Sequence, residues 1–134
     1  SQFSKKICIS RKDAPFRKVV NEDEVFEIFK KLGFVSYGLS SLSVAEQIML
    51  FYQAEVILSF QGTGLANSIY CTPKTKIIEL FQSLGDCTFW YISQIFHLNY
   101  IPIPTVPFER DFMKAWKSDT YMPLSVVEKV KQII

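Results

Sequence analysis

Residues 58–67 join the end of an apolar strand, a Gly-x-Gly turn and the start of a helix without a spacer. The segment 55–59 is a short, β-branched apolar run, which is typical of a buried parallel strand. Gly62 and Gly64 are expected to allow positive φ and close approach to the backbone. Residues 65–70 are expected to start a helix whose first N–H groups and dipole point back over the turn. The stretch therefore predicts an anion site that would fit a phosphate or diphosphate.

The turn alone does not identify the ligand, because two glycines can also serve only a tight strand-to-helix connection. The dinucleotide-binding fingerprint is incomplete in this chain. Asn67 stands where its third glycine belongs, no acidic residue follows at the expected place, and the turn follows the third strand of the chain instead of the first. NAD is therefore disfavoured as the ligand.

The remaining elements predict an α/β fold. Four more strands are expected, at 6–10, 34–37, 76–81 and 100–103, and helical segments at 21–33, 43–52, 88–98 and 125–134. Strands that alternate with helices form parallel β–α–β units. We therefore expect one three-layer Rossmann-like domain over the 134 residues, with a mainly parallel sheet of about five strands. Its core would span about 6–103, and 104–134 would form a C-terminal extension and helix.

Two of the helices have the spacing of a capping box at their starts, beginning at Asn21 and at Ser43. The segment 88–98 is so rich in aromatic residues that it predicts a buried helix. Its aromatic side chains are expected in the core rather than stacked on a ligand, and they are Phe89, Trp90, Tyr91 and Phe96.

Three parts of the chain are expected to meet where the strands end. Arg11 follows the first strand, the turn 61–67 follows the third, and Glu79 lies near the end of the fourth. Ligands of open α/β sheets bind beyond the carboxyl ends of the strands, and an arginine there can hold a phosphate bidentately. Arg11 could instead belong to a solvated loop. Glu79, which is costly to bury unpaired, could accept hydrogen bonds from sugar hydroxyls or from the glycine turn.

Composition argues against several other classes of function. The formal net charge of +2 is too balanced to indicate a nucleic-acid partner. The chain has three cysteines, none in C-x-x-C spacing, and the single histidine, His97, reads as a helix end. Neither a disulfide framework nor a metal site is therefore expected. No run approaches the ~18 apolar residues of a membrane span.

Several short motifs occur in order over about residues 6–103. They are Ile9-Ser10-Arg11 with Arg17, Asn21-Glu22-Asp23-Glu24, Leu42-Ser43, Glu46-Gln47-Ile48, Phe51 with Ala54, Gly62-Thr63-Gly64-Leu65-Ala66-Asn67 and Ile77-Ile78-Glu79. As an ordered set, these motifs resemble family 61 glycosyltransferases. The resemblance implies the C-terminal, nucleotide-sugar-binding half of an inverting GT-B enzyme. Such an enzyme would act in capsular or other polysaccharide synthesis, or in glycoprotein glycan synthesis.

The resemblance also implies roles for individual residues. Arg11 would stabilise the leaving UDP in place of a metal, so that the UDP-sugar is a co-substrate and no cofactor is needed. Backbone donors would come from Gly62, Thr63 and Gly64, next to Leu65. Asn67 would orient the helix start or a phosphate, and Glu79 would hold hydroxyl groups.

One position departs from the family pattern. The family usually carries His before the first glycine of this turn, and Gln61 replaces it here. Glutamine can hydrogen-bond but cannot become cationic. A Rossmann-like module without transferase activity, serving in ligand binding or protein interaction, and a small phosphate sensor therefore remain as alternatives.

The resemblance implies partners outside this chain. The acceptor, a glycan or glycoprotein, would bind an N-terminal half that these residues do not include, and the general base would lie mostly there. The few cysteines favour the bacterial cytoplasm or inner membrane face, with the lumen of the secretory pathway as the alternative.

Overall fold

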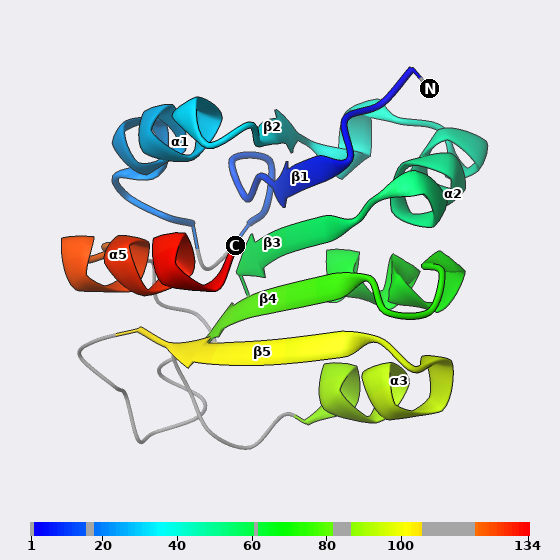
Figure 1. The fold of residues 1–134 in the computed structure, drawn as a ribbon. Helices are drawn as coiled ribbons and strands as arrows, with labels where there is room; N and C mark the ends of the chain where they lie inside the picture. Colours follow the sequence, from blue (N-terminus) through cyan, green and yellow to red (C-terminus); the bar gives the residue numbers. More distant parts are fainter. Residues whose placement is uncertain (1, 16–17, 61, 82–86, 106–119) are drawn as a thin grey trace.

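The structure of the protein is a computed structural model, and it describes residues 2–15, 18–60, 62–81, 87–105 and 120–134. Within these residues the chain forms one five-stranded, all-parallel sheet in the order β2-β1-β3-β4-β5 (Figure 1). The predicted α/β fold, a three-layer Rossmann-like domain with a parallel sheet, is confirmed. The strands are β1 (Lys6–Ile9), β2 (Val35–Tyr37), β3 (Val56–Phe60), β4 (Lys76–Phe81) and β5 (Asn99–Pro104).

Helices cover both faces of the sheet. One layer consists of α1 (Glu22–Lys31) and α5 (Leu124–Ile133), and the other consists of α2 (Val44–Gln53), the 3₁₀ helix η2 (Thr63–Tyr70) and α3 (Thr88–Phe96). Figure 1 shows the first layer to the left of the sheet and the second to the right. Right-handed crossovers explain this division for the helices that connect strands. The connection from β1 to β2 moves toward one edge of the sheet and every later connection moves toward the other edge, so α1 lies on one face and α2, η2 and α3 lie on the other.

Alternate residues of each strand enter two separate cores. In β3, Ile57 packs with α2 and Leu65 of η2, whereas its neighbour Leu58 packs with Phe29 of α1 and Val126 of α5. A strand covered on both faces must be apolar at successive positions, which is why these strands appear in the sequence as continuous apolar runs.

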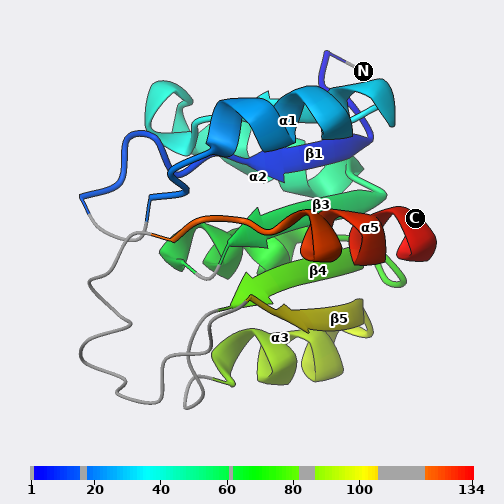
Figure 2. The same cartoon turned by 90° about the vertical axis from the view of Figure 1, so that its left-hand side faces the viewer.

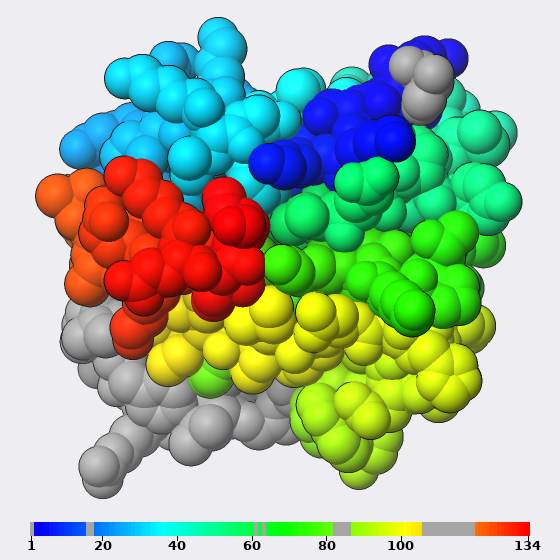
Figure 3. Space-filling model, viewed as in Figure 1, coloured from blue at the N-terminus to red at the C-terminus, as the bar shows by residue number. Residues whose placement is uncertain are grey.

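The C-terminal helix belongs to this packed domain and extends the core beyond residues 6–103. Met122, Val126 and Val130 are buried in the same core as α1. Figures 2 and 3 show α5, in red, beside α1 on one face of the molecule. Backbone hydrogen bonds also pair the chain before α1 with the chain before α5, including Val20 N–H to Thr120 O at 2.8 Å.

The two predicted capping boxes differ in outcome. The one at Ser43 is confirmed, because its hydroxyl accepts from Glu46 N–H at 3.1 Å and the Glu46 carboxylate accepts from Ser43 N–H at 3.0 Å. The one at Asn21 is wrong, since this side chain makes no capping bond. Its Oδ1 accepts from Met122 N–H at 2.8 Å and its Nδ2 donates to Met122 O at 3.0 Å. A tertiary contact across the chain has replaced the local one.

The prediction of a buried aromatic helix at 88–98 is wrong for most of its side chains. Phe89 is buried, but Trp90, Tyr91 and Phe96 are 44%, 57% and 37% exposed. A single helix layer buries only the stripe that faces the sheet, whatever the character of its other side. Among the described residues, no helix has both the length and the apolar character needed to cross a membrane.

Candidate functional site

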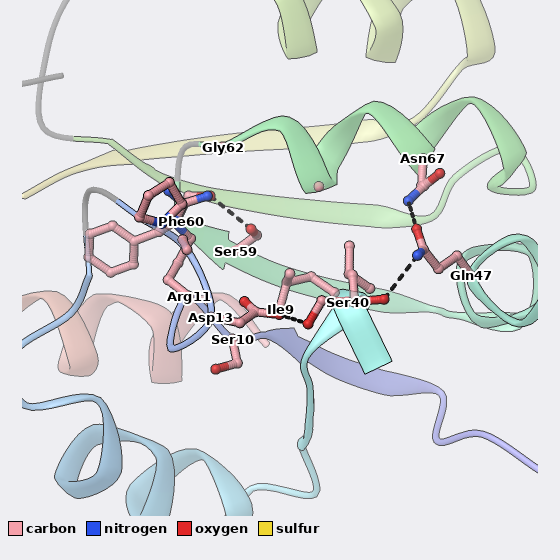
Figure 4. Close-up of a pocket in the computed structure, with 14 residues that line it drawn as sticks. Ile9, Ser10, Arg11, Asp13, Ser40, Gln47, Ser59, Phe60, Gly62 and Asn67 are labelled. Carbon is pink, nitrogen blue, oxygen red and sulfur yellow. Dashed lines mark hydrogen bonds between the residues drawn. The ribbon is translucent and has the colours of Figure 1, made fainter. Parts of the chain in front are cut away.

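A cavity of about 560 Å³ opens beyond the carboxyl ends of β1 and β3 (Figure 4). These two strands are the place where the direction of the strand order reverses, which is where open α/β sheets bind ligands. Its described lining consists of Ile9, Ser10, Arg11, Asp13, Ala14, Pro15, Leu39, Ser40, Gln47, Ser59, Phe60, Gly62, Gly64 and Asn67.

The loop after β1 is held by the first residue of α1. The Glu22 carboxylate accepts from the Ser10 hydroxyl at 3.0 Å and from the Arg11 backbone N–H at 2.9 Å. The Lys12 ammonium pairs with Asp23 outside the cavity, and this hydrogen bond raises the pKa of Lys12. The loop therefore sends Arg11 into the cavity and the neighbouring lysine away from it. Glu22 was not among the predicted site residues.

Arg11 and Gly62 lie directly against each other. A Cβ added to Gly62 would lie 2.3 Å from Nη1 and 3.1 Å from Cζ of Arg11, so a larger residue would displace the guanidinium. Positive φ was predicted here, and this is wrong. Gly62 has φ 179°, which any residue adopts, and Gly64 is not in the left-handed region either. The glycine at position 62 provides space for Arg11. Close approach of a ligand to this backbone stays a prediction.

The helix after the turn is of the 3₁₀ type and begins two residues earlier than predicted. Leu65 N–H donates to Gly62 O at 3.2 Å, the i to i+3 bond of that tighter winding. Leu65 is fully buried in the core under this turn, so it supports the site without lining the cavity. Gln61 lies outside the described residues, and of Thr63 only the backbone is described.

An amide pair forms the far end of the cavity from Arg11 (Figure 4). Asn67 Nδ2 donates to Gln47 Oε1 at 3.0 Å, and Gln47 Nε2 donates to Leu39 O at 2.9 Å. These bonds connect η2 and α2 to the 3₁₀ helix η1 (Leu39–Ser41) and fix both amide groups. Gln47 was not predicted as a site residue. The available signal was its place in the motif 46–48.

Glu79 does not line the cavity. It is 2% exposed within β4, where it lies beside Ser59 of β3, and its Oε1 accepts a hydrogen bond from the Tyr100 hydroxyl. Because two more strand residues follow Glu79, its side chain remains under the helix layer instead of reaching the edge of the sheet. Its role with ligand hydroxyls stays a prediction, but the structure does not bring it to the cavity with Arg11.

Asp13 supplies the carboxylate that does line the cavity. The Ser40 hydroxyl donates to its Oδ2, and this bond is the main reason that the pKa of Asp13 is lowered. The Asp13 and Ser40 backbone N–H groups and the Arg11 charge lower it further. Asp13 was not predicted as a site residue, because an acidic residue in a polar loop carries no signal of its own.

Cys8, Cys71 and Cys87 are free thiols. Burial raises the pKa of Cys8 and of Cys71 to about 12, with the Glu22 charge adding to the effect at Cys8. His97 lies at the end of α3, as its sequence context predicts, and it adopts a left-handed conformation with φ 58°. In the part of the chain that the structure describes, no three His, Cys, Asp or Glu side chains gather where they could hold a metal ion.

A comparison with known protein families matches the part of the chain that forms the cavity. The model of the family Glycosyltransferase 61 matches residues 1–78, more than half of the 134. The chain belongs to the glycosyltransferase 61 family. Every described residue that lines the cavity lies inside the matched segment, whereas Glu79 falls one position beyond it. No curated protein matches the chain.

Proposed function

We propose that this glycosyltransferase 61 chain binds the donor of an inverting, UDP-sugar-dependent reaction, as one nucleotide-binding half of a GT-B enzyme. The observation that carries the proposal is the contact of Arg11 with Gly62 inside a cavity at the reversal of strand order. A volume of about 560 Å³ suits a small organic ligand. The UDP-sugar would be a co-substrate, with neither cofactor nor metal required.

The phosphate end of the donor would lie at Arg11. When the glycosidic bond to the diphosphate breaks, negative charge grows on the leaving UDP, and a fixed guanidinium stabilises that charge. The first N–H groups of η2, at Thr63 and Gly64, precede the Leu65 bond and have no acceptor within the helix. They would add backbone donors next to Arg11. Gln61 would add an amide group at the same turn.

The nucleoside end would lie toward the amide pair. Ile9 and Leu39 give the cavity apolar walls, and the amides of Gln47 and Asn67 lie at its far end from Arg11. A flat base suits apolar walls with a few oriented polar groups. The acceptor, a glycan or glycoprotein, and the base that deprotonates it would belong to a separate acceptor-binding half.

The test is a calorimetric titration of UDP, with GDP and ADP as comparisons, into this chain and two variants. Arg11→Ala removes the guanidinium from the cavity. Lys12→Ala is the matched control, since it removes the same charge one residue along but from a side chain that pairs with Asp23 outside the cavity. We expect selective UDP binding that weakens at least about tenfold in Arg11→Ala, because a charge-assisted bond to phosphate is lost. Lys12→Ala should bind as the unmodified chain does.

Equal weakening in both variants would mean that only general positive charge attracts the nucleotide. No binding of any nucleotide by the folded chain would contradict an autonomous donor site. That result would favour the alternative hypothesis, a Rossmann-like module without transferase activity. Gln61, in place of the histidine usual in the family, raises this alternative.

A further inference from the structure

Asp13 places a negative charge in the same cavity as Arg11. Figure 4 shows it on the rim between Arg11 and Ser40, and its side chain is exposed to solvent. A site that bound only phosphate would gain nothing from a carboxylate there, because like charges repel. The position of Asp13 therefore needs another explanation than anion binding.

The carboxylate is oriented by its neighbour. The Ser40 hydroxyl donates to Oδ2 of Asp13, and η1 holds Ser40 in place through a Ser41 N–H bond to Gly38 O at 3.2 Å. An ionised carboxylate has about four acceptor sites, so the Ser40 hydroxyl and the backbone N–H groups of Asp13 and Ser40 still leave capacity for a further donor. Asp13 is in this acceptor-only form at neutral pH, because its pKa is lowered from an ordinary value that is already acidic.

We propose that Asp13, oriented by Ser40, determines specificity by accepting hydrogen bonds from hydroxyl groups of the ligand whose diphosphate Arg11 holds. This inference rests on the proposed donor site. The hydroxyls can come from the ribose or from the transferred sugar, which share this chemistry. The same charge disfavours ligands that bring more phosphate and fewer hydroxyls, so the Arg11 and Asp13 pair selects a diphosphate that carries hydroxyls.

A substitution that removes the charge but keeps the shape separates this role from a structural one. Asp13→Asn retains an oxygen that can accept from Ser40. It should bind inorganic pyrophosphate several-fold more tightly than the unmodified chain, because repulsion is lost. It should also lose roughly tenfold in its preference for a hydroxyl-bearing ligand, because a charge-assisted hydrogen bond becomes a neutral one. A structural role would weaken both ligands together.

The experiment titrates pyrophosphate, UDP, 2′-deoxy-UDP and UDP-glucose into the unmodified chain, Asp13→Asn and two further variants. Asp23→Asn is the matched control, because it removes an acidic charge that pairs with Lys12 outside the cavity. Ser40→Ala leaves the Asp13 charge but frees its orientation, so it should lower hydroxyl preference without tightening pyrophosphate.

The ratios of affinities identify the source of the hydroxyls. Loss of the preference for UDP over 2′-deoxy-UDP in Asp13→Asn assigns them to the ribose, and loss of the preference for UDP-glucose over UDP assigns them to the sugar. Unchanged ratios in Asp13→Asn, or equal weakening of all four ligands, would overturn the inference. If Arg11→Ala leaves pyrophosphate and UDP affinity unchanged, the donor site itself fails. The two failures are therefore distinguishable.

Discussion

The two helix layers of this domain bury similar apolar faces against the sheet, but the sides that face the solvent differ in polarity. In α1 and α5, charged residues such as Glu27 and Lys131 point to solvent. The sequences of α2, η2 and α3 together contain one charged residue, Glu46. Their exposed side chains are largely apolar or aromatic, and include Val44, Met49, Tyr52, Ile69, Tyr70, Trp90, Tyr91, Ile95 and Phe96. Burial against the sheet is therefore independent of what a helix carries on its other side.

The largest expected effect tests whether the two buried faces are equivalent. Phe29 of α1 and Phe51 of α2 are each at most 1% exposed, on opposite faces of the sheet. We expect Phe29→Ala and Phe51→Ala each to lower the free energy of unfolding by about 3–5 kcal/mol, through lost burial and a residual cavity. Urea unfolding measures both. A cost below about 1 kcal/mol for Phe51→Ala would show that the layer of α2 is loosely packed.

The next effect concerns the two helix starts. Asn21→Ala removes both hydrogen bonds to Met122 and should cost roughly 2 kcal/mol of unfolding free energy. Ser43→Ala removes a local cap and should cost about 1 kcal/mol. As a control, Asn21→Asp keeps the acceptor for Met122 N–H and should lose less. If Ser43→Ala costs more than Asn21→Ala, the Asn21 bonds do not anchor the segment before α5.

Substitutions of two glycines should separate effects on stability from effects on binding. Gly33 follows helix α1, and Gly62 follows strand β3. Gly33 ends α1 with φ +93°, so Gly33→Ala should cost about 1–2 kcal/mol of unfolding free energy without affecting nucleotide binding. Gly62→Ala should change stability little, but it should weaken UDP binding roughly tenfold, because its Cβ displaces the Arg11 guanidinium. Thermal unfolding and calorimetry measure the two effects. Unchanged UDP affinity in Gly62→Ala would contradict the role of this contact.

A smaller effect is expected from pH at the start of α2. The Ser43 backbone N–H, and then its hydroxyl, lower the pKa of the Glu46 carboxyl in the folded state. Its stabilising contribution is therefore present above the ordinary glutamate pKa and is lost as pH falls through the lowered value. Glu46→Gln should flatten the acid side of the stability profile slightly. Glu24→Gln in α1 is the control, because its helix has no capping box.

The smallest effect on stability is expected on the outer faces. Ile95 is 68% exposed, so Ile95→Ser should change the free energy of unfolding by less than about 0.5 kcal/mol, as should Glu27→Ser in α1. Sedimentation should nevertheless show less self-association in Ile95→Ser alone, because it removes exposed apolar surface. Equal sedimentation of the two variants would mean that the apolar outer face does not promote contact between copies.

The strands and most helices were predictable because their signals are local. A β-branched apolar run such as Ile77 and Ile78 has few alternatives to a buried strand, and the Ser43 box is complete within four residues. The predictions failed where a distant part of the chain competes. Asn21 bonds to Met122, which is 101 residues away, and the aromatic residues of α3 meet only one side of a sheet.

The candidate site divides in the same way. The sequence by itself determined that Arg11 and the glycine turn follow strands of one parallel sheet, and this was enough to bring them to one edge. Only the tertiary structure decided that Asp13 and Gln47 join them while Glu79 stays buried in β4. Strand order and side-chain direction decide which residues share a cavity, and both depend on packing between elements that are far apart in the chain.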